Sequence, residues 1–380
     1  MAKLRVGVLF GGRSAEHEVS LVSASSVLRG LNPKKYEVIP IGIGKDGHWV
    51  LPRQLPSSAP THSDLRRALA DGRAVSLPPE PGSAALVRRP APSRSSGLAV
   101  DVIFPVLHGT FGEDGTVQGL LELADIPYVG AGVLGSALGM DKEVQKRLFL
   151  QAKLPVADFV SVLRRDWQLR RRAVLREVSR RLRFPVFVKP SNLGSSVGIT
   201  KVSRAAGLPA AIEHAFEFDR KILVEQGILG REIEVSVLGN DEPRASLPGE
   251  VIPAREFYDY TAKYLEDTTR FLVPARLTRG QTRRFQELAV AAFRALDCAG
   301  MARVDFLMAR RTGRIYLNEV NTIPGFTAIS MYPKLWEASG VPYSKLLDSL
   351  IELALERHRE KRRTRFSIEL PRRRGGVLKE

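Results

Sequence analysis

Residues 303–321 constrain the fold most strongly, because they read as two apolar strands joined by a tight turn at 311–313 (RVDFLMARRTGRIYLNEVN). A three-residue loop with glycine in the left-handed position is a common hairpin connection. Counting back along both strands from such a loop predicts that Asp305 lies opposite Glu319. Asn321 follows Glu319 by two residues, so it projects from the same face of its strand.

An Asp, a Glu and an Asn on one face form an all-oxygen cluster, which suits a hard divalent cation such as Mg²⁺. Two directly opposed carboxylates otherwise repel each other. Arg303 shares this face and adds an anion-binding group beside the predicted metal. The alternative is a solvated hairpin with scattered charges, but the strands are too apolar for an exposed ribbon.

The bulk composition describes an ordinary globular protein. Its 380 residues suffice for two or three domains, with 44% hydrophobic and 26% charged residues. The longest apolar runs fall short of the roughly 20 residues that a membrane helix needs. The N-terminus enters an apparent strand at once, so we expect a mature cytoplasmic protein without a membrane partner. Cys298 is the single cysteine, which excludes an internal disulfide.

The net charge of +17 suggests acidic partners. The excess lies largely in residues 164–183 and in the tail at 357–379. The first segment resembles the polar face of a helix that keeps Trp167, Leu169 and Val178 among its apolar positions. The tail has few aromatic residues to stack on bases. We therefore interpret both as solvated basic surface and expect no specific nucleic-acid partner, although nonspecific polyanion affinity at low salt is plausible.

Strands expected at 4–10, 36–43 and 100–107 alternate with helices, which predicts a doubly wound parallel α/β domain over residues 1–130. Residues 52–97 are rich in Pro, Ser and Arg and are expected to form an irregular insertion with one short helix near 64–70.

The rest of the chain has a mixed α+β texture with antiparallel pairing. One helix is expected at about 136–153. We divide this part into a central domain at 131–230, a C-terminal domain at 231–360 and a basic tail at 361–380.

Residues 189–198 (KPSNLGSSVG) lie between two expected strands. Glycines let the backbone approach a ligand and serines add hydroxyl donors, so the segment suits phosphate oxygens, with Lys189 supplying positive charge. It is not a P-loop, and a structural hairpin turn is an equal alternative. His108 ends an apolar strand, where a histidine is more often a local hydrogen-bonding residue than a catalyst.

The order and spacing of seven motifs carry a resemblance. They are GGRSAEHEVS (11–20), HGTFGEDG (108–115), MDK (140–142), KPSNLGSSVG (189–198), EFYDYTAKY (256–264), RVDF (303–306) and NEVNTIPGFT (318–327). Over residues 4–355 the chain closely resembles the D-alanine–D-alanine ligase family of the ATP-grasp superfamily. The resemblance implies three domains, with ATP held between the central and C-terminal domains.

The resemblance also implies the nucleotide and metal contacts. The ATP phosphates would be held by Lys142, Lys189, Ser195 and Ser196, the adenine by Glu225 and Ile228, and the ribose by Glu232, with Lys263 also in the nucleotide site. Two Mg²⁺ or Mn²⁺ ions would be bound by Asp305, Glu319 and Asn321. Family members often have Lys where this chain has Gln226, which puts one adenine-side contact in doubt.

On the substrate side, the implied reaction activates one D-alanine as an acyl phosphate and joins it to a second, for peptidoglycan synthesis. Substrate contacts would come from Glu16, His108, Arg303 and Ser330, with Glu16 on the first ammonium and Ser330 on the second carboxylate. Arg303 and the Gly325 N–H would stabilise the tetrahedral oxyanion, and Tyr264 and Ser195 would close the site with Glu16. The YDYTAKY loop favours D-alanine as acceptor over D-lactate, the alternative. The family resemblance suggests a homodimer.

Overall fold

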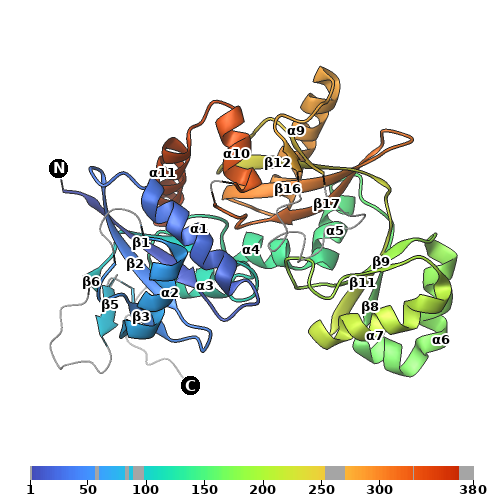
Figure 1. Cartoon of the computed structure of the whole chain (residues 1–380), viewed down its shortest axis with the longest axis horizontal. Helices are drawn as coiled ribbons and strands as arrows, with labels where there is room; N and C mark the ends of the chain where they lie inside the picture. The colour runs from blue at the N-terminus through green and yellow to red at the C-terminus, as the bar shows by residue number, and fades with distance from the viewer. Residues whose placement is uncertain are drawn as a thin grey trace, which may run out of the picture.

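The computed structural model describes residues 2–55, 60–81, 85–88, 98–252, 270–327 and 329–367. They form three β-sheets with helices packed against them (Figure 1). Predicted site residues Lys263 and Tyr264 lie outside the described residues. No helix in the described ranges has the length and apolar character needed to cross a membrane.

The N-terminal sheet has the strand order β6-β5-β4-β3-β2-β1-β7. Its parallel part is formed by β1 (Leu4–Gly11), β2 (Tyr36–Ile43) and β7 (Val102–Val106), as predicted from their apolar runs. The antiparallel extension comprises β3 (Trp49–Leu51), β4 (Arg73–Ser76), β5 (Ala85–Arg88) and β6 (Leu98–Ala99). The helices are α1 (His17–Gly30), α2 (His62–Asp71) and α3 (Thr116–Leu123).

The expectation of an irregular insertion at 52–97 is therefore wrong in part. The short helix is present as α2, which begins at the capping box of Thr61 and Asp64. The strands of the described part are only two to four residues long, so their alternation is too brief to stand out among Pro and Ser residues.

The single helix expected at 136–153 is two helices, α4 (Val133–Met140) and α5 (Lys142–Gln151). Asp141 separates them with extended backbone (φ −85°, ψ 98°), and its carboxylate accepts a hydrogen bond from Val144 N at 3.1 Å. Because Asp141 is the N-cap of α5, it directs Lys142 to the first helical position.

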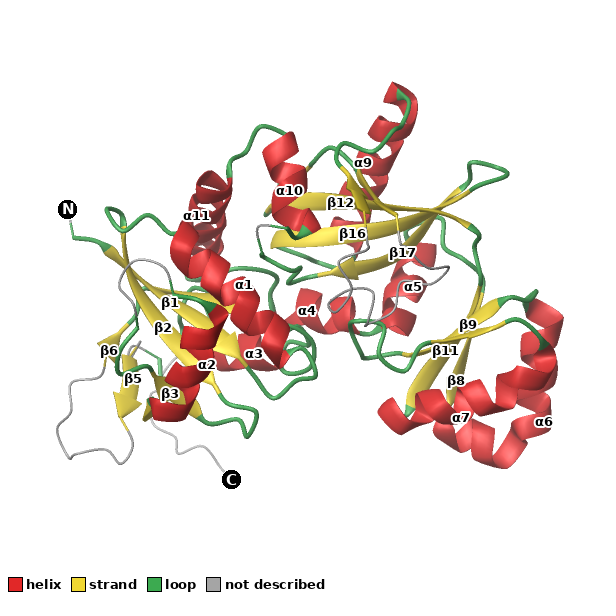
Figure 2. Cartoon of the chain, viewed as in Figure 1, coloured by secondary structure: helices red, strands yellow, loops and turns green. Residues whose placement is uncertain are grey.

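The central sheet is antiparallel, in the order β10 (Thr200–Val202), β9 (Val186–Pro190), β11 (Lys221–Gln226) and β8 (Phe159–Leu163). The helices α6 (Arg164–Arg181) and α7 (Leu208–Phe218) pack on it, and the 3₁₀ helix η1 (Ala205–Gly207) precedes α7 (Figure 2). Trp167 and Val178 are buried as predicted, but Leu169 is 70% exposed. Non-helical backbone at Arg170 interrupts the periodicity there.

The C-terminal sheet has the order β15-β14-β12-β16-β17, with β13 beside β12. Its strands are β12 (Gly230–Gly239), β13 (Arg244–Ala245), β14 (Gly249–Ile252), β15 (Arg270–Leu272), β16 (Gly300–Ala309) and β17 (Ile315–Asn321). Its helices are α9 (Arg279–Ala295), α10 (Met331–Ala338) and α11 (Tyr343–Lys361). The apolar face of α9, including Phe285 and Leu288, packs with Val235 and Val304 in one core.

The predicted hairpin is formed by β16 and β17, and Asp305 does lie opposite Glu319. The predicted three-residue loop is wrong, because Met308 pairs with Ile315 and a four-residue loop at 310–313 connects the strands. Asn318 is an extra residue in β17 and forms a β-bulge. The bulge restores the expected pairing of Asp305 with Glu319.

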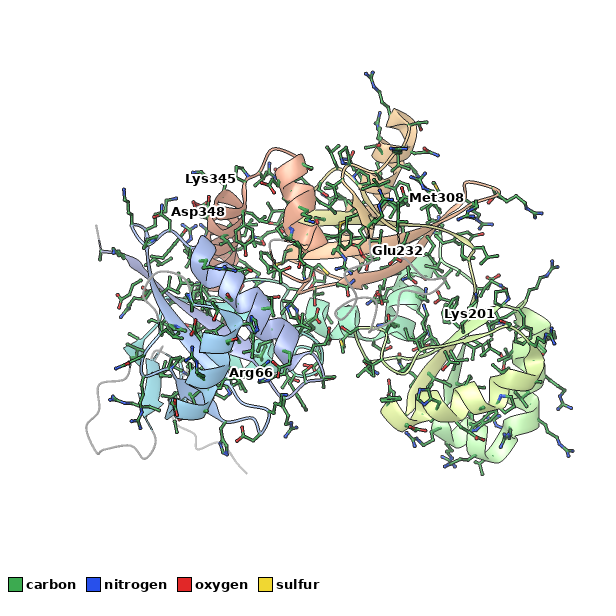
Figure 3. The ribbon with its side chains drawn as sticks, in the orientation of Figure 1. Arg66, Lys201, Glu232, Met308, Lys345 and Asp348 are labelled. Atoms are coloured by element: carbon green, nitrogen blue, oxygen red, sulfur yellow. The ribbon has the colours of Figure 1, made fainter. Side chains whose placement is uncertain are left out.

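The last helix joins two parts of the molecule. Leu347 and Leu350 of α11 share a buried cluster with Val6 and Phe104 of the N-terminal sheet. Asp348 lies on α11 (Figure 3). It accepts hydrogen bonds from Tyr36 Oη at 2.8 Å and Lys35 Nζ at 2.7 Å. Helix α11 therefore fixes the N-terminal sheet against the C-terminal one.

Candidate active site

The predicted metal-binding face is formed by β16 and β17. Asp305 accepts two hydrogen bonds from the guanidinium of Arg303, at 2.7 Å each, and one from Asn321 Nδ2 at 2.9 Å. Burial lowers the pKa of Arg303, but the charges of Asp305 and Glu234 outweigh it and raise the pKa well above its usual value. Arg303 is therefore a permanent cation at the centre of this face.

Glu319 faces a different cation. Its Oε2 lies 3.2 Å from Lys142 Nζ, which also donates to the carbonyl oxygen of Leu193 at 2.8 Å. The two opposed carboxylates are thus each compensated by a basic side chain. These two contacts bring together α5, the serine-rich loop at residues 191–198 and the hairpin of β16 and β17.

A second group of ion pairs is centred on Glu225. Glu225 of β11 forms ion pairs with Lys189 of β9, at 2.6 Å, and with Lys146 of α5, whose side chain is only 2% exposed. Lys146 also donates to the carbonyl oxygen of bulged Asn318 at 3.2 Å. Burial raises the pKa of Glu225, but the two lysines outweigh it and lower the pKa below its usual value. Both carboxylate oxygens are therefore engaged, and an adenine contact from Glu225 stays a prediction.

The serine-rich loop closes on the N-terminal domain. Ser195 and Ser196 both have left-handed backbone (φ +49° and +59°), a conformation that non-glycine residues adopt mainly where surrounding contacts require it. The hydroxyl of Ser195 donates to the carboxylate of Glu16, the N-cap residue of α1. A Cβ at Gly194 would lie 2.6 Å from Glu16 Oε2, so a side chain there would displace the Glu16 carboxylate. The structure thus brings predicted Glu16 and Ser195 into direct contact.

Gly325 and Ser330 lie close together between β17 and α10. A Cβ on Gly325 would lie 3.0 Å from Ser330 Oγ. Ser330 is the N-cap residue of α10, but its hydroxyl bonds to Thr327 instead, accepting from the backbone N–H at 3.1 Å.

Two predicted contacts look different in the structure. His108 uses both ring nitrogens within the protein, Nδ1 with the Ile323 carbonyl oxygen and Nε2 with Ser23 Oγ, each at 3.0 Å. Its direct substrate contact therefore stays a prediction. The Gln226 amide pairs with the backbone of Arg183, accepting from its N–H at 2.7 Å and donating to its carbonyl oxygen.

Ile228 and Glu232, which are predicted to contact the adenine and the ribose, lie on two linked segments. Ile228 is half-buried in the connection between β11 and β12. Glu232 lies on β12 of the C-terminal sheet (Figure 3), close enough for its charge to act on Lys189 of the central sheet. The predicted nucleotide residues therefore gather between these two sheets.

Sequence reasoning missed three charged residues, of which Lys146 and Glu234 are buried and Glu113 is half-buried. Lys146 lies one helical turn after Lys142, a spacing that places both on one face of α5. Glu234 lies two residues after Glu232 on β12, hence on the same face, with Oε2 3.2 Å from Arg303 Nε. Glu113 follows His108 in a motif already singled out, and burial together with nearby Glu16 raises its pKa to about 8.

These residues fit a nucleotide with divalent cations. Among the described residues no three His, Cys, Asp or Glu side chains could hold a metal by themselves. Two carboxylates and an amide form an incomplete oxygen set, which phosphate oxygens would complete. Lys142 and Lys189 lie beside that set and suit the same phosphates.

Solved structures resemble the whole chain. The D-alanine-D-alanine ligase from Coxiella burnetii matches with a TM-score of 0.82 at 38% identity, covering 96% of this chain and 97% of that one. The VanG D-Ala:D-Ser ligase from Enterococcus faecalis also has a TM-score of 0.82 at 38% identity, covering 93% and 100%. The fold and the lysine–carboxylate site thus define an ATP-dependent ligase with the ATP-grasp fold.

Family models and curated relatives specify the kind of ligase. Residues 5–131 match the D-ala D-ala ligase N-terminus model, and residues 148–352 match the C-terminus model. A D-alanine–D-alanine ligase from Solibacter usitatus is 53% identical, covering 96% of this chain and 99% of the relative. One from Heliobacterium modesticaldum is 50% identical, covering 96% and 98%. The chain belongs to the D-alanine–D-alanine ligase family.

Proposed function

We propose that the chain joins two D-alanine molecules, with ATP hydrolysed to ADP and phosphate, to supply D-alanyl-D-alanine for peptidoglycan precursors. The observation that carries this proposal is a continuous set of contacts through the loop at 191–198. Ser195 of this loop contacts Glu16, and Leu193 accepts a hydrogen bond from Lys142. Lys142 pairs with Glu319, which lies opposite Asp305 and its partner Arg303. A carboxylate oxygen is a poor leaving group, so the first D-alanine is activated as its acyl phosphate before the second amine attacks.

Separate residues of the chain bind the substrates, the nucleotide and the metal ions. Glu16 holds the first ammonium, and the Ser195 hydroxyl holds Glu16 in place. Lys142 and Lys189 bind the nucleotide phosphates. Asp305, Glu319 and Asn321 would hold two Mg²⁺ or Mn²⁺ ions, which would supply positive charge for phosphoryl transfer. Arg303 and the Gly325 N–H stabilise the oxyanion, and Ser330 holds the acceptor carboxylate.

The acceptor is the least constrained part of the proposal. The loop expected to recognise it, residues 256–264, lies outside the described residues. A solved relative is a D-Ala:D-Ser ligase, which favours D-serine as a second acceptor beside D-lactate. Product analysis by mass spectrometry with D-alanine alone and with D-serine or D-lactate added decides this. We expect D-alanyl-D-alanine to dominate; a dominant mixed product would contradict the proposed acceptor.

We further propose that the enzyme acts as a cytoplasmic homodimer. Three apolar side chains on the adjoining helices α3 and α4 support an interface there. They are Leu123, which is 63% exposed, Val133 and Leu134. Light scattering should give twice the chain mass, and Leu134→Glu should give the monomer mass; a monomeric wild-type protein would contradict this.

A further inference from the structure

The loop at 322–327, which carries Gly325, is held from outside its own sheet. Glu113 accepts the N–H of Ile323 at 3.1 Å, and His108 donates to the Ile323 carbonyl oxygen at 3.0 Å. Both polar backbone groups of Ile323 are thus bound by side chains from the segment that follows β7 in the N-terminal domain.

The other side of Gly325 is held through Ser23 of α1. The Phe326 N–H lies 3.3 Å from Ser23 Oγ, which lies 3.0 Å from His108 Nε2. Nδ1 carries a proton because its partner is a carbonyl oxygen, and in the neutral ring Nε2 then accepts the Ser23 hydroxyl hydrogen. Burial lowers the pKa of His108, in agreement with that state.

Further contacts make this attachment rigid. Glu113 uses its second oxygen to accept the Gly109 N–H at 2.7 Å, so its carboxyl spans two loops. The Phe326 ring packs edge-on against Phe104 of β7, with centroids 5.8 Å apart. Ser23 is fully buried, and His108 nearly so. Gly325 therefore lies between Ile323 and Phe326, whose backbone groups are both held by side chains of the N-terminal domain.

We propose that Ser23, His108 and Glu113 form a positioning set that directs the Gly325 N–H at the oxyanion of the second reaction step. This inference rests on the proposed function. A positioning defect of about 1 Å can lower a rate about 100-fold. Lys142, Lys189 and the metal ligands lie outside the set, so phosphorylation of the first D-alanine would persist without it.

A loosened loop therefore has a specific consequence. The acyl phosphate forms, but attack by the second amine slows. The acyl phosphate then dissociates, and in solution, where no contact from Gly325 is needed, water adds to its carbonyl carbon. The bond from that carbon to the phosphate oxygen breaks, and D-alanine and phosphate are released. Phosphate release becomes uncoupled from dipeptide formation, which a general loss of stability would not cause.

The test measures phosphate and dipeptide together in three full-length variants. Ser23→Ala removes the contact to Phe326, and Glu113→Gln leaves a single acceptor oxygen for two N–H groups. The control, Ser25→Ala, removes a buried hydroxyl of the same helix that bonds to Pro60 O at 2.6 Å, away from the loop. Melting temperatures report whether each variant is folded.

The wild-type protein and Ser25→Ala should release one phosphate per dipeptide. Ser23→Ala and Glu113→Gln should release at least about twofold excess phosphate, with dipeptide formation lowered about tenfold and the ATP KM little changed. A ratio of one in both variants would overturn the inference while leaving the proposed function intact. A wild-type protein that releases no phosphate with D-alanine would overturn the proposed function itself.

Discussion

Lys142 Nζ lies 3.2 Å from Glu319 Oε2, so a predicted phosphate-binding lysine and a predicted metal ligand neutralise each other. Arg303 and Asp305 form a similar pair one strand away. Binding of a magnesium nucleotide would exchange these partners, with the lysine passing to phosphate and the carboxylate to the cation. The two ion pairs thus supply both the positive charge that suits phosphate and the negative charge that suits the cation.

Glu319→Gln should lower dipeptide formation at least about 100-fold, because a neutral amide binds the cation poorly and leaves transition-state charge unbalanced. Lys142 keeps its bond to the Leu193 carbonyl, so the free energy of unfolding should change by less than about 1 kcal/mol. Turnover and denaturant unfolding check both. Glu177→Gln, in an exposed pair with Arg181, is the control, and normal turnover of Glu319→Gln would contradict the metal assignment.

Lys146→Met should lower the free energy of unfolding by about 3 kcal/mol, since it leaves the buried Glu225 carboxylate with one lysine fewer. The double variant Lys146→Met/Glu225→Gln should recover part of that loss. Lys153→Met, outside this network, serves as the control. Urea unfolding at pH 7 gives the values, and equal stability of Lys146→Met and wild type would show that the ion pair is not needed.

Glu113 should make the ligand-free protein less stable as pH rises. Burial and Glu16 raise its pKa to about 8 in the folded state, above its usual value near 4.5, while nearby Lys142 acts in the opposite direction. The folded state then binds more protons than the unfolded state between these two values, so this group's contribution to stability declines from about pH 5 to pH 8. The difference between wild type and Glu113→Gln, followed by urea unfolding across that range, should show this decline; a pH-independent difference would contradict the raised pKa.

The last part of the basic tail, residues 368–380, should be dispensable for catalysis. α11 ends at Lys361, which pairs with Glu122, and Arg362 pairs with Asp125. Deleting residues 368–380 retains both contacts, so kcat/KM for D-alanine should stay within about twofold, as expected for a change away from the site. A large loss of activity would assign the tail a role in the site.

The hairpin shows which features could be predicted from the sequence. The opposition of Asp305 and Glu319 was predictable from strand alternation and a glycine turn, although the loop is longer and Asn318 forms a bulge. These two differences cancel beyond the turn. The carbonyl oxygen of bulged Asn318 accepts a hydrogen bond from Lys146 of α5, a tertiary contact that periodicity cannot reveal.

Other features could not be predicted from the sequence because they depend on partners that are distant in the chain. The motif containing His108 indicated a site, but its contacts with Ser23 and Ile323 require the folded arrangement of three segments. The prediction that the opposed carboxylates repel each other was incomplete for the same reason, because Lys142 and Arg303 compensate them. α10 was missed, since Pro333 lies within its eight residues and obscures the helical pattern.

The central claim is that this site uses magnesium and ATP to activate D-alanine. The most direct measurement is phosphate release from ATP with D-alanine or L-alanine, each with and without Mg²⁺. We predict rapid release with D-alanine and Mg²⁺ together, and background release in the other three reactions. Equal release with both enantiomers, or full release with D-alanine after the divalent metal is removed, would contradict the account.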